Sequence, residues 1–160
     1  MSRENGRDHD ETAPLATRLS RAPRLSQPAK ARKRLDELLA TCGCDALAAL
    51  VGRPGVRAVL EGVADHSPFL WRLASLDAAR LARILAASPE KELDRLIAAM
   101  RADGLALDDE KALMRALRLA KQEAALLIAL ADIGGAWGVV EITRALSRFA
   151  DAAISASLDF

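Results

Sequence analysis

Two long segments near the end of the sequence repeat their apolar residues in alternating steps of three and four, the spacing of one helix face. The first repeat consists of Leu113, Leu117, Ala120, Ala124, Leu127 or Ile128, and Ala131. The second consists of Val139, Ile142, Leu146, Phe149, Ala153 and Ser157. Gly134 and Gly135 interrupt the pattern between them. The sequence therefore predicts a long antiparallel helical hairpin over residues 109–160.

The composition extends this prediction to the whole chain. Aromatic residues make up only 3% of the 160 residues and tyrosine is absent, whereas hydrophobic residues reach 51%. Ala, Leu and Arg recur throughout, and all three favour helices over strands. We therefore predict an all-α fold, a multi-helix array with a real core. The 23 Lys and Arg nearly cancel the 22 Asp and Glu, so no global charge draws the chain to nucleic acid or anionic lipid.

Shorter helices are predicted from their caps and terminating residues. A first helix containing Leu35 fades at Cys42-Gly43-Cys44, Asp45 can cap a short helix that ends at Gly52, and Pro54-Gly55 opens residues 56–65. Ser67-Pro68 and Ser88-Pro89 each combine a capping hydroxyl with a proline at the first helical position. Asp77 can cap residues 78–87, Gly104 is expected to stop the following helix, and the acids of residues 108–110 open the next.

Residues 1–31 are predicted to form a disordered leader, ahead of a helical region over residues 32–160. The leader contains Pro14, Pro23 and Pro28 and too few large apolar residues to offset the entropy of ordering. Its distal part and the start of the next helix are basic and carry no acid: Arg18, Arg21, Arg24, Lys30, Arg32, Lys33 and Arg34. Such an arm can hold phosphate or an acidic partner, or can simply keep the chain soluble.

The sequence offers no membrane or export signal. Its longest wholly apolar run covers residues 124–131 and ends at Asp132, far short of a membrane span. The acidic start lacks the apolar stretch of a signal peptide, so the cytoplasm is expected. Cys42 and Cys44 fit reduced thiols there, because their spacing builds no disulfide framework.

Several residue groups resemble metal or catalytic sites superficially, and we predict a structural role for each. Asp8, His9 and Asp10 lie in the leader without a rigid scaffold, and Asp108, Asp109 and Glu110 suit a helix N-terminus. Cys42 and Cys44 with His9 and His66 lack zinc-site spacing, and His66 has no partner that would make it a base. Gly134, Gly135 and Gly138 follow no strand and precede no Lys-Ser/Thr pair, so they form a turn.

Two further groups are candidates for binding surfaces. Arg115, Arg118, Lys121, Gln122 and Glu123 form the most polar part of the first long helix; they are either solvated or face another domain. Trp71 and Trp137 are expected to anchor the core or the hairpin rather than a ligand. The sequence therefore predicts no catalytic, cofactor-binding or metal-ligating residue.

Residues 56–160 resemble the glutamine synthetase adenylyltransferase family. Ser67-Pro68-Phe69-Leu70, then Leu73 and residues 77–85, look like the start of its folded part. Residues 114–158, MRALRLAKQEAALLIALADIGGAWGVVEITRALSRFADAAISASL, closely resemble the helical hairpin that leads into the first nucleotidyltransferase domain of that family.

The resemblance implies a bifunctional parent enzyme with two nucleotidyltransferase domains. One removes AMP from a tyrosine of glutamine synthetase by phosphorolysis, and the other attaches AMP from ATP; both use Mg²⁺. A PII-type nitrogen signal protein is the implied regulator. The family's catalytic signature, a Gly-rich turn with Glu-Leu and then Ser-Asp-x-Asp, does not occur in this sequence, so no catalytic residue carries over. The resemblance implies a non-catalytic scaffold.

The apolar pattern continues through Ile154, Leu158 and Phe160 without a residue that ends a helix. We expect that the chain is part of a longer protein and that the hairpin's open end docks on a missing nucleotidyltransferase domain. An alternative is a free-standing helical adaptor that binds a protein or nucleic acid through its basic arm.

Overall fold

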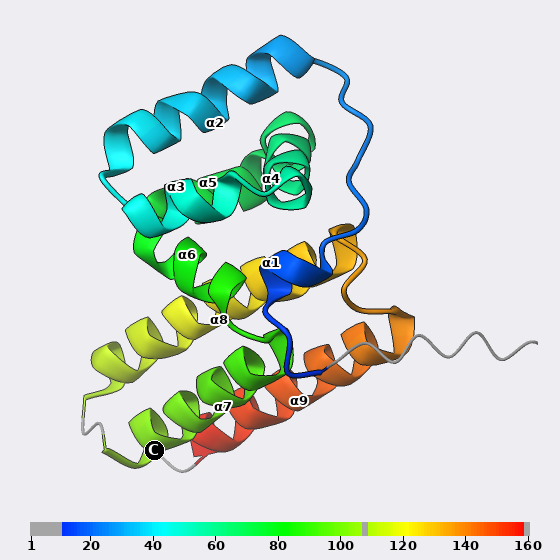
Figure 1. Ribbon diagram of the computed structural model, residues 1–160. Helices are drawn as coiled ribbons and strands as arrows, with labels where there is room; N and C mark the ends of the chain where they lie inside the picture. Colours follow the sequence, from blue (N-terminus) through cyan, green and yellow to red (C-terminus); the bar gives the residue numbers. More distant parts are fainter. Residues whose placement is uncertain (1–10, 107–108, 159–160) are drawn as a thin grey trace, which may run out of the picture.

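A computed structural model describes residues 11–106 and 109–158, and the regular secondary structure of this part is helical throughout (Figure 1). The helices are α1 (Leu15–Arg18), α2 (Pro28–Cys42), α3 (Asp45–Val51), α4 (Pro54–His66), α5 (Pro68–Leu76), α6 (Ala78–Ala86), α7 (Pro89–Ala106), α8 (Glu110–Ile133) and α9 (Val139–Leu158). The all-α prediction is confirmed.

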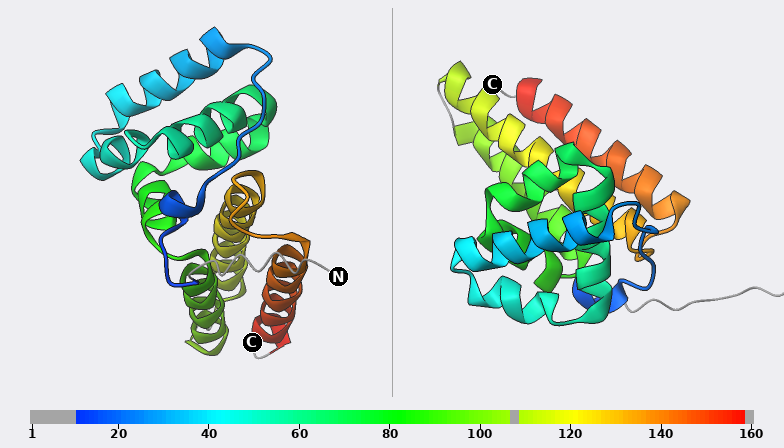
Figure 2. Two further views of the ribbon diagram at one scale, coloured as in Figure 1. Left: turned by 45° about the vertical axis from the view of Figure 1, so that its right-hand side comes forward. Right: turned by 90° about the horizontal axis from the view of Figure 1, so that it is seen from above.

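The helices form two packed groups. In one group α4 contacts α2, α3 and α5, and in the other α7 contacts both α8 and α9 (Figure 2). Helix α6 contacts α1, α3 and α5, and the contact of α5 with α8 joins the two groups. The buried apolar side chains from α1 to α9 belong to one continuous core.

The predicted caps Ser67, Asp77 and Ser88 are confirmed, and Asp109, predicted with its neighbours to open a helix, is the cap of α8. The side chains of Ser67, Asp77, Ser88 and Asp109 each accept a hydrogen bond from a backbone N–H two or three residues later, at 2.9–3.2 Å. These bonds satisfy N–H groups that have no partner within their helix. Asp45 is different, because Cys44 occupies the cap position of α3 and Asp45 is the first helical residue. The prediction that Asp45 caps this helix is wrong.

The predicted helix stop at Gly104 is also wrong. Gly104 lies inside α7, which continues to Ala106. A single glycine costs a helix only about 1 kcal/mol relative to alanine, too little to end it against the packing of a long helix. Asp108, proposed with Asp109 as the start of the next helix, lies outside the described residues.

The long hairpin is confirmed, since α8 and α9 run antiparallel on either side of the turn at residues 134–138 (Figure 1). However, α9 packs more extensively on α7 than on α8. Its fully buried residues are Ala145, Ala152 and Ala156. Leu146, expected in the buried stripe, is 54% exposed. The small alanines allow α9 to approach α7 closely, and this rotates Leu146 outward.

The predicted disorder of the leader up to Ala31 is corrected by the structure. Residues 1–10 lie outside the described residues, but residues 11–31 have defined positions. Leu15 is 0% exposed, Leu19 is 8% exposed, and Pro28 begins α2. The apolar residues of this segment are few, yet Leu15, Ala16 and Leu19 are buried in the common core, which stabilises an ordered path.

Candidate functional site

The outer face of α9 has no packing partner in the described part of the chain. Nine consecutive positions on this face are exposed and uncharged: Val139, Val140, Thr143, Leu146, Ser147, Ala150, Ile154, Ser157 and Leu158. Five of them are large apolar residues that are 54–80% exposed. Large apolar residues arranged in one stripe, rather than singly, are typical of a surface that contacts another protein or domain.

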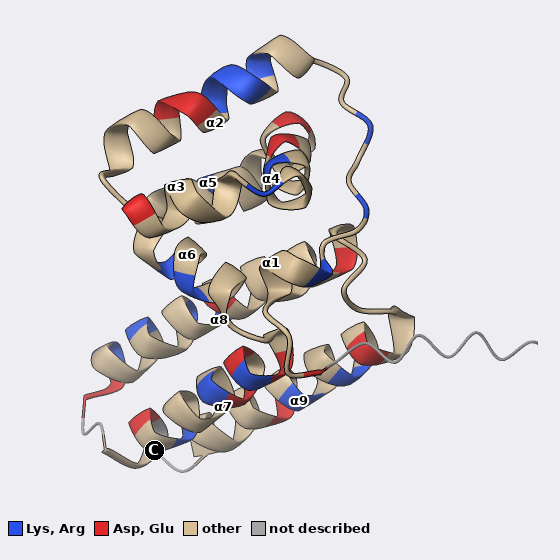
Figure 3. Ribbon diagram, in the orientation of Figure 1, with Lys and Arg blue, Asp and Glu red and all other residues tan. Residues whose placement is uncertain are grey.

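The charged residues of α9 lie beside this face and not on it. Arg148 donates a hydrogen bond to the carboxylate of Asp94 on α7, at 2.6 Å. Glu141 accepts a hydrogen bond from the backbone N–H of Gly138, at 3.0 Å. Asp151 is the last charged residue of the helix, so its final turns carry no charge (Figure 3). The arrangement can bury area against an apolar partner without removing any charge from water.

A buried polar node lies at the N-terminus of α7. Arg18 donates two hydrogen bonds to the carboxylate of Glu90, at 2.8 and 2.9 Å, and a third to the carbonyl oxygen of Ala136. The indole N–H of Trp137 donates to the same carboxylate at 2.7 Å. A carboxylate here also interacts favourably with the helix dipole. The node joins α1, α7 and the α8–α9 turn, and it confirms that Trp137 anchors the hairpin.

A second charged cluster joins α6, α7 and α8. Glu92 is almost completely buried and accepts hydrogen bonds from Arg83 and Arg95, both at 3.0 Å; both arginines also pair with Glu123. Burial by itself raises the pKa of Glu92, but the bonds from Arg95 and Arg83 outweigh this and hold the pKa below its ordinary value. Burial lowers the pKa of Arg83, and Glu92 and Glu123 more than restore it, so this pKa is raised.

The predicted polar patch of α8 is therefore divided. Glu123 belongs to the charged cluster, whereas Arg115, Arg118 and Lys121 are exposed. Arg115 and Arg118 line an open hollow with Glu110, Lys111 and Met114. Their guanidinium groups remain free to meet an acidic or polar surface.

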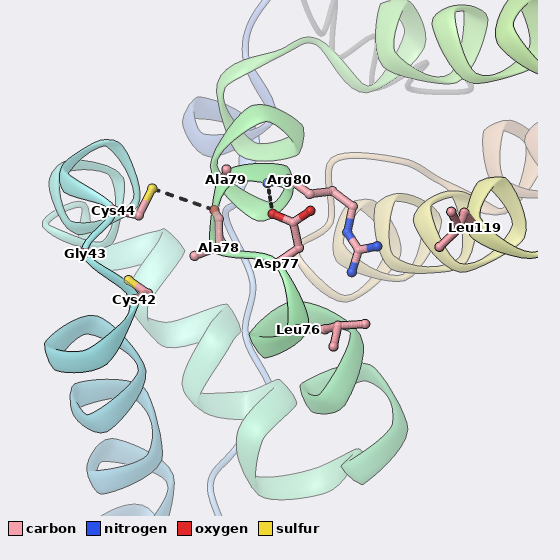
Figure 4. A pocket seen from close by; sticks show the side chains of 9 residues that line it. All are labelled: Cys42, Gly43, Cys44, Leu76, Asp77, Ala78, Ala79, Arg80 and Leu119. Carbon is pink, nitrogen blue, oxygen red and sulfur yellow. Dashed lines mark hydrogen bonds between the residues drawn. The ribbon is translucent and has the colours of Figure 1, made fainter. Parts of the chain in front are cut away.

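An open hollow of about 600 Å³ lies between the α2–α3 turn and the start of α6 (Figure 4). Its walls include Cys42 and Cys44, which are free thiols, together with Asp77, Arg80 and Leu119. Asp77 is occupied as a helix cap, and Arg80 donates a hydrogen bond to the carbonyl oxygen of Leu73 at 2.7 Å. The polar side chains of Asp77 and Arg80 therefore already make hydrogen bonds within the fold. The residues that line the hollow do not pair a nucleophile with a base.

In the described part of the chain, the side chains that resemble metal ligands are not brought together. His66 is the last residue of α4, and its Nε2 is 2.9 Å from the carbonyl oxygen of Arg24. His9, Asp8 and Asp10 lie outside the described residues. Within residues 11–106 and 109–158, no three His, Cys, Asp or Glu side chains are grouped as metal ligands. In the same ranges, no helix is long and apolar enough to cross a membrane.

Sequence reasoning missed the partners that make both charged clusters. Arg18 and Glu90 are 72 positions apart, and Arg83 and Glu123 are 40 apart, so no helical spacing connects them. Only the acidic first turn of α7 was visible as a sequence signal. The node and the cluster arise from packing between helices and hold the scaffold together.

Comparisons with known proteins give the relationship of this chain. A model of the family described as glutamate-ammonia ligase adenylyltransferase matches residues 58–160. The chain is 39% identical over 159 residues to the bifunctional glutamine synthetase adenylyltransferase/adenylyl-removing enzyme of Bradyrhizobium diazoefficiens. It is 41% identical over 157 residues to the enzyme of that name from Xanthobacter autotrophicus.

These alignments cover 98% and 96% of this chain but only 16% of each relative. The same holds for a Rhodopseudomonas palustris enzyme of that name, 40% identical over 157 residues. No solved structure matches the chain. Because the family model covers more than half of the sequence, the chain belongs to the glutamate-ammonia ligase adenylyltransferase family.

Proposed function

We propose that this chain is the N-terminal helical portion of a bifunctional glutamine synthetase adenylyltransferase/adenylyl-removing enzyme and that it acts as a non-catalytic scaffold. The observation that carries the proposal is the alignment with such an enzyme, which covers 98% of this chain and 16% of the length of the enzyme. The parent enzyme would act in the cytoplasm on a tyrosine of glutamine synthetase. Its nucleotidyltransferase domains would use ATP and Mg²⁺, and a PII-type protein would signal nitrogen status to it.

The scaffold would dock on the following nucleotidyltransferase domain through the outer face of α9. This face presents Val139, Leu146, Ile154 and Leu158 without an interrupting charge. A domain with a matching apolar face would remove these side chains from water, at about 25 cal/mol per Å² of apolar area. Arg115 and Arg118 are exposed on the neighbouring helix α8 and would supply the polar rim of the contact.

The adaptor alternative loses support because most of its basic arm is engaged within the chain. Arg18 binds Glu90, Arg21 donates to the carbonyl oxygen of Asp132, and Arg34 donates to that of Ala64. Lys33 is 3.8 Å from Glu37 on the next turn of α2. A nucleic acid or acidic partner would have to compete with these contacts.

Complementation in two pieces tests the proposal. The matching part of the Bradyrhizobium diazoefficiens enzyme is removed, and the remainder is mixed with this chain and assayed for AMP transfer to glutamine synthetase and for its removal. The proposal predicts that this chain alone is inactive and that adding it raises the activity of the remainder. The double variant Leu146→Glu/Ile154→Glu should fail to do so, because it places two charges in the contact.

The matched control is Ser155→Glu, which adds a charge at an exposed position of α9 outside the uncharged face. It should complement as well as the parent chain. Metal-dependent turnover by the isolated chain that survives repurification would contradict the scaffold role. Equal complementation by the double variant would show that α9 is not the docking surface.

A further inference from the structure

Residues 14–27, called the strap here, cross from the core near α7 to the start of α2. On the way they pass between the α8–α9 turn and α4 (Figure 1). Backbone N–H groups of Ser20 and Arg21 both donate to the carbonyl oxygen of Gly134, at 2.9 and 3.1 Å. The strap therefore contacts both helix groups of the molecule.

Four glycines lie directly under the strap, although they are up to 80 positions apart in sequence. A Cβ atom on Gly55 would lie 2.6 Å from the carbonyl oxygen of Leu19, and one on Gly62 would lie 2.6 Å from Cδ of Pro23. A Cβ atom on Gly134 would clash with the Leu19 side chain, and one on Gly135 would lie 2.5 Å from Nε of Arg21. Any larger residue at Gly55 or Gly62 would push against backbone or a proline ring.

The two ends of the strap are held by charged groups. At its start, Arg18 binds Glu90 and the carbonyl oxygen of Ala136, next to Trp137. At its end, the carboxylate of Asp65 accepts hydrogen bonds from the backbone N–H groups of Ser26 and Gln27. The Asp65 side chain is only 1% exposed and supplies the N-terminal cap that α2 lacks in its own sequence. The four glycines leave room for the strap, and the charged groups hold both of its ends. The surface beneath the strap therefore fits this segment closely.

We propose that the strap is a latch that couples α4 to the α8–α9 turn, so that its release at Gly62 also loosens the turn around Trp137. Strap residues bind the turn through Gly134 and Ala136, and they bind α4 through Gly62 and Asp65. Arg18 lies five residues before Pro23 in the strap, so a displacement of Pro23 also moves Arg18. Arg18 binds the carboxylate of Glu90, and the same carboxylate accepts the hydrogen bond of the Trp137 indole. The latch goes beyond the proposed scaffold role and does not depend on what covers α9.

The test uses Gly62→Ala in a Trp71→Phe background, in which Trp137 is the sole tryptophan. Alanine is normally favoured over glycine within a helix, so any loosening comes from the clash with Pro23. Trypsin cleavage at Arg21 and Arg24 should become about tenfold faster or more, because cleavage follows the population of the open strap. The fluorescence of Trp137 should shift to longer wavelength as its hydrogen bond and burial are lost.

Two controls separate the latch from general damage. Adding Pro23→Ala to Gly62→Ala removes Cγ and Cδ, the two closest ring atoms, and should restore slow cleavage and the parent emission. Gly138→Ala lies beside Trp137 but would meet only the end of the Glu141 side chain, so it should leave both readouts unchanged. If Gly62→Ala does not fold, as judged by circular dichroism, Asp65→Ala tests the same coupling from the other contact on α4.

Faster cleavage with an unchanged Trp137 spectrum would overturn the latch, because the strap would then open without affecting the turn. Unchanged cleavage would also overturn it, since Gly62 would not then hold the strap. Only the joint change of both readouts, with its reversal by Pro23→Ala, is consistent with the proposal.

Discussion

Helices α4 and α9 are both amphipathic, but the apolar residues that they bury differ in size. In α4 the large apolar residues Val56, Val59, Leu60 and Val63 are 0–1% exposed, and contacts reach it from several helices and the strap. In α9 the fully buried positions are alanines, Ile142 and Phe149 are half-buried against the core, and the other large apolar residues are exposed. The large side chains of the central helix α4 fill the core, whereas most of the large apolar side chains of α9 lie on its outer face.

This difference separates stability from interaction. Side chains of α4 remove apolar area from water within the chain itself, and their loss leaves a cavity. Side chains on the outer face of α9 contribute little to folding, since they are exposed in the described structure. The following changes test this division, from the largest expected effect to the smallest.

Truncation in α4 should have the largest effect. Leu60→Ala should lower the free energy of unfolding by about 2–5 kcal/mol, through lost transfer energy and a residual cavity. Leu146→Ala in α9 should lower it by about 0.5 kcal/mol or less, as for a surface position. Urea unfolding followed by circular dichroism measures both. Equal losses would show that Leu146 is buried in solution and that the division between the helices is wrong.

Removing a charge from the buried cluster should come next. Glu92→Gln should cost about 1–3 kcal/mol, because Arg83 and Arg95 lose charged hydrogen bonds at a side chain that is only 4% exposed. Asp94→Asn breaks the exposed pair with Arg148 and should cost about 0.5 kcal/mol or less. Thermal unfolding of the two variants at pH 7 compares them. A larger cost for Asp94→Asn would contradict the assignment of Glu92 to the framework.

The same cluster sets an acid dependence of stability. The pKa of Glu92 in the folded chain lies below its ordinary value of 4.5, so its contribution is fully present above pH 4.5. That contribution is lost as the pH falls through the folded pKa, because the unfolded chain then binds the proton more readily. Asp65 acts in the same direction: burial raises its pKa, yet bonds from Ser26 and Gln27 hold it below 3.8. Unfolding curves between pH 6 and pH 3 should therefore show a smaller decline for Glu92→Gln than for the parent chain.

Charges on the outer face of α9 should have the smallest effect on folding and a clear effect on association. Leu146→Glu/Ile154→Glu should change the free energy of unfolding by about 0.5 kcal/mol or less. The parent chain should associate as its concentration rises, because its apolar stripe is uncovered, and the double variant should stay monomeric. Light scattering over a concentration series measures this. A monomeric parent chain at high concentration would show that the stripe alone does not promote association.

Local sequence signals predicted most of the elements and few of their contacts. The caps at Ser67, Asp77, Ser88 and Asp109 could be recognised because each acts within its own helix turn. The buried face of α9 was predicted only in part: Ile142, Phe149 and Ala153 of the predicted stripe pack against the core, whereas Leu146 is exposed. Two stripes satisfy the helical spacing, and they differ only by a rotation of the helix. The stripe with Leu146 contains more bulk, whereas the stripe with Ala145 fits closely against α7.

The sequence by itself determined that this chain is helical and where most of its helices begin, since propensity, caps and periodicity act over a few residues. The family resemblance came separately, from the likeness of residues 56–160 to known sequences. Only the tertiary structure decided that the strap is ordered, because its stability comes from Gly62, Gly134 and Glu90, far away in sequence. It likewise decided that Leu146, Ile154 and Leu158 of α9 face outward, because burial depends on what packs against a helix and not on its own spacing.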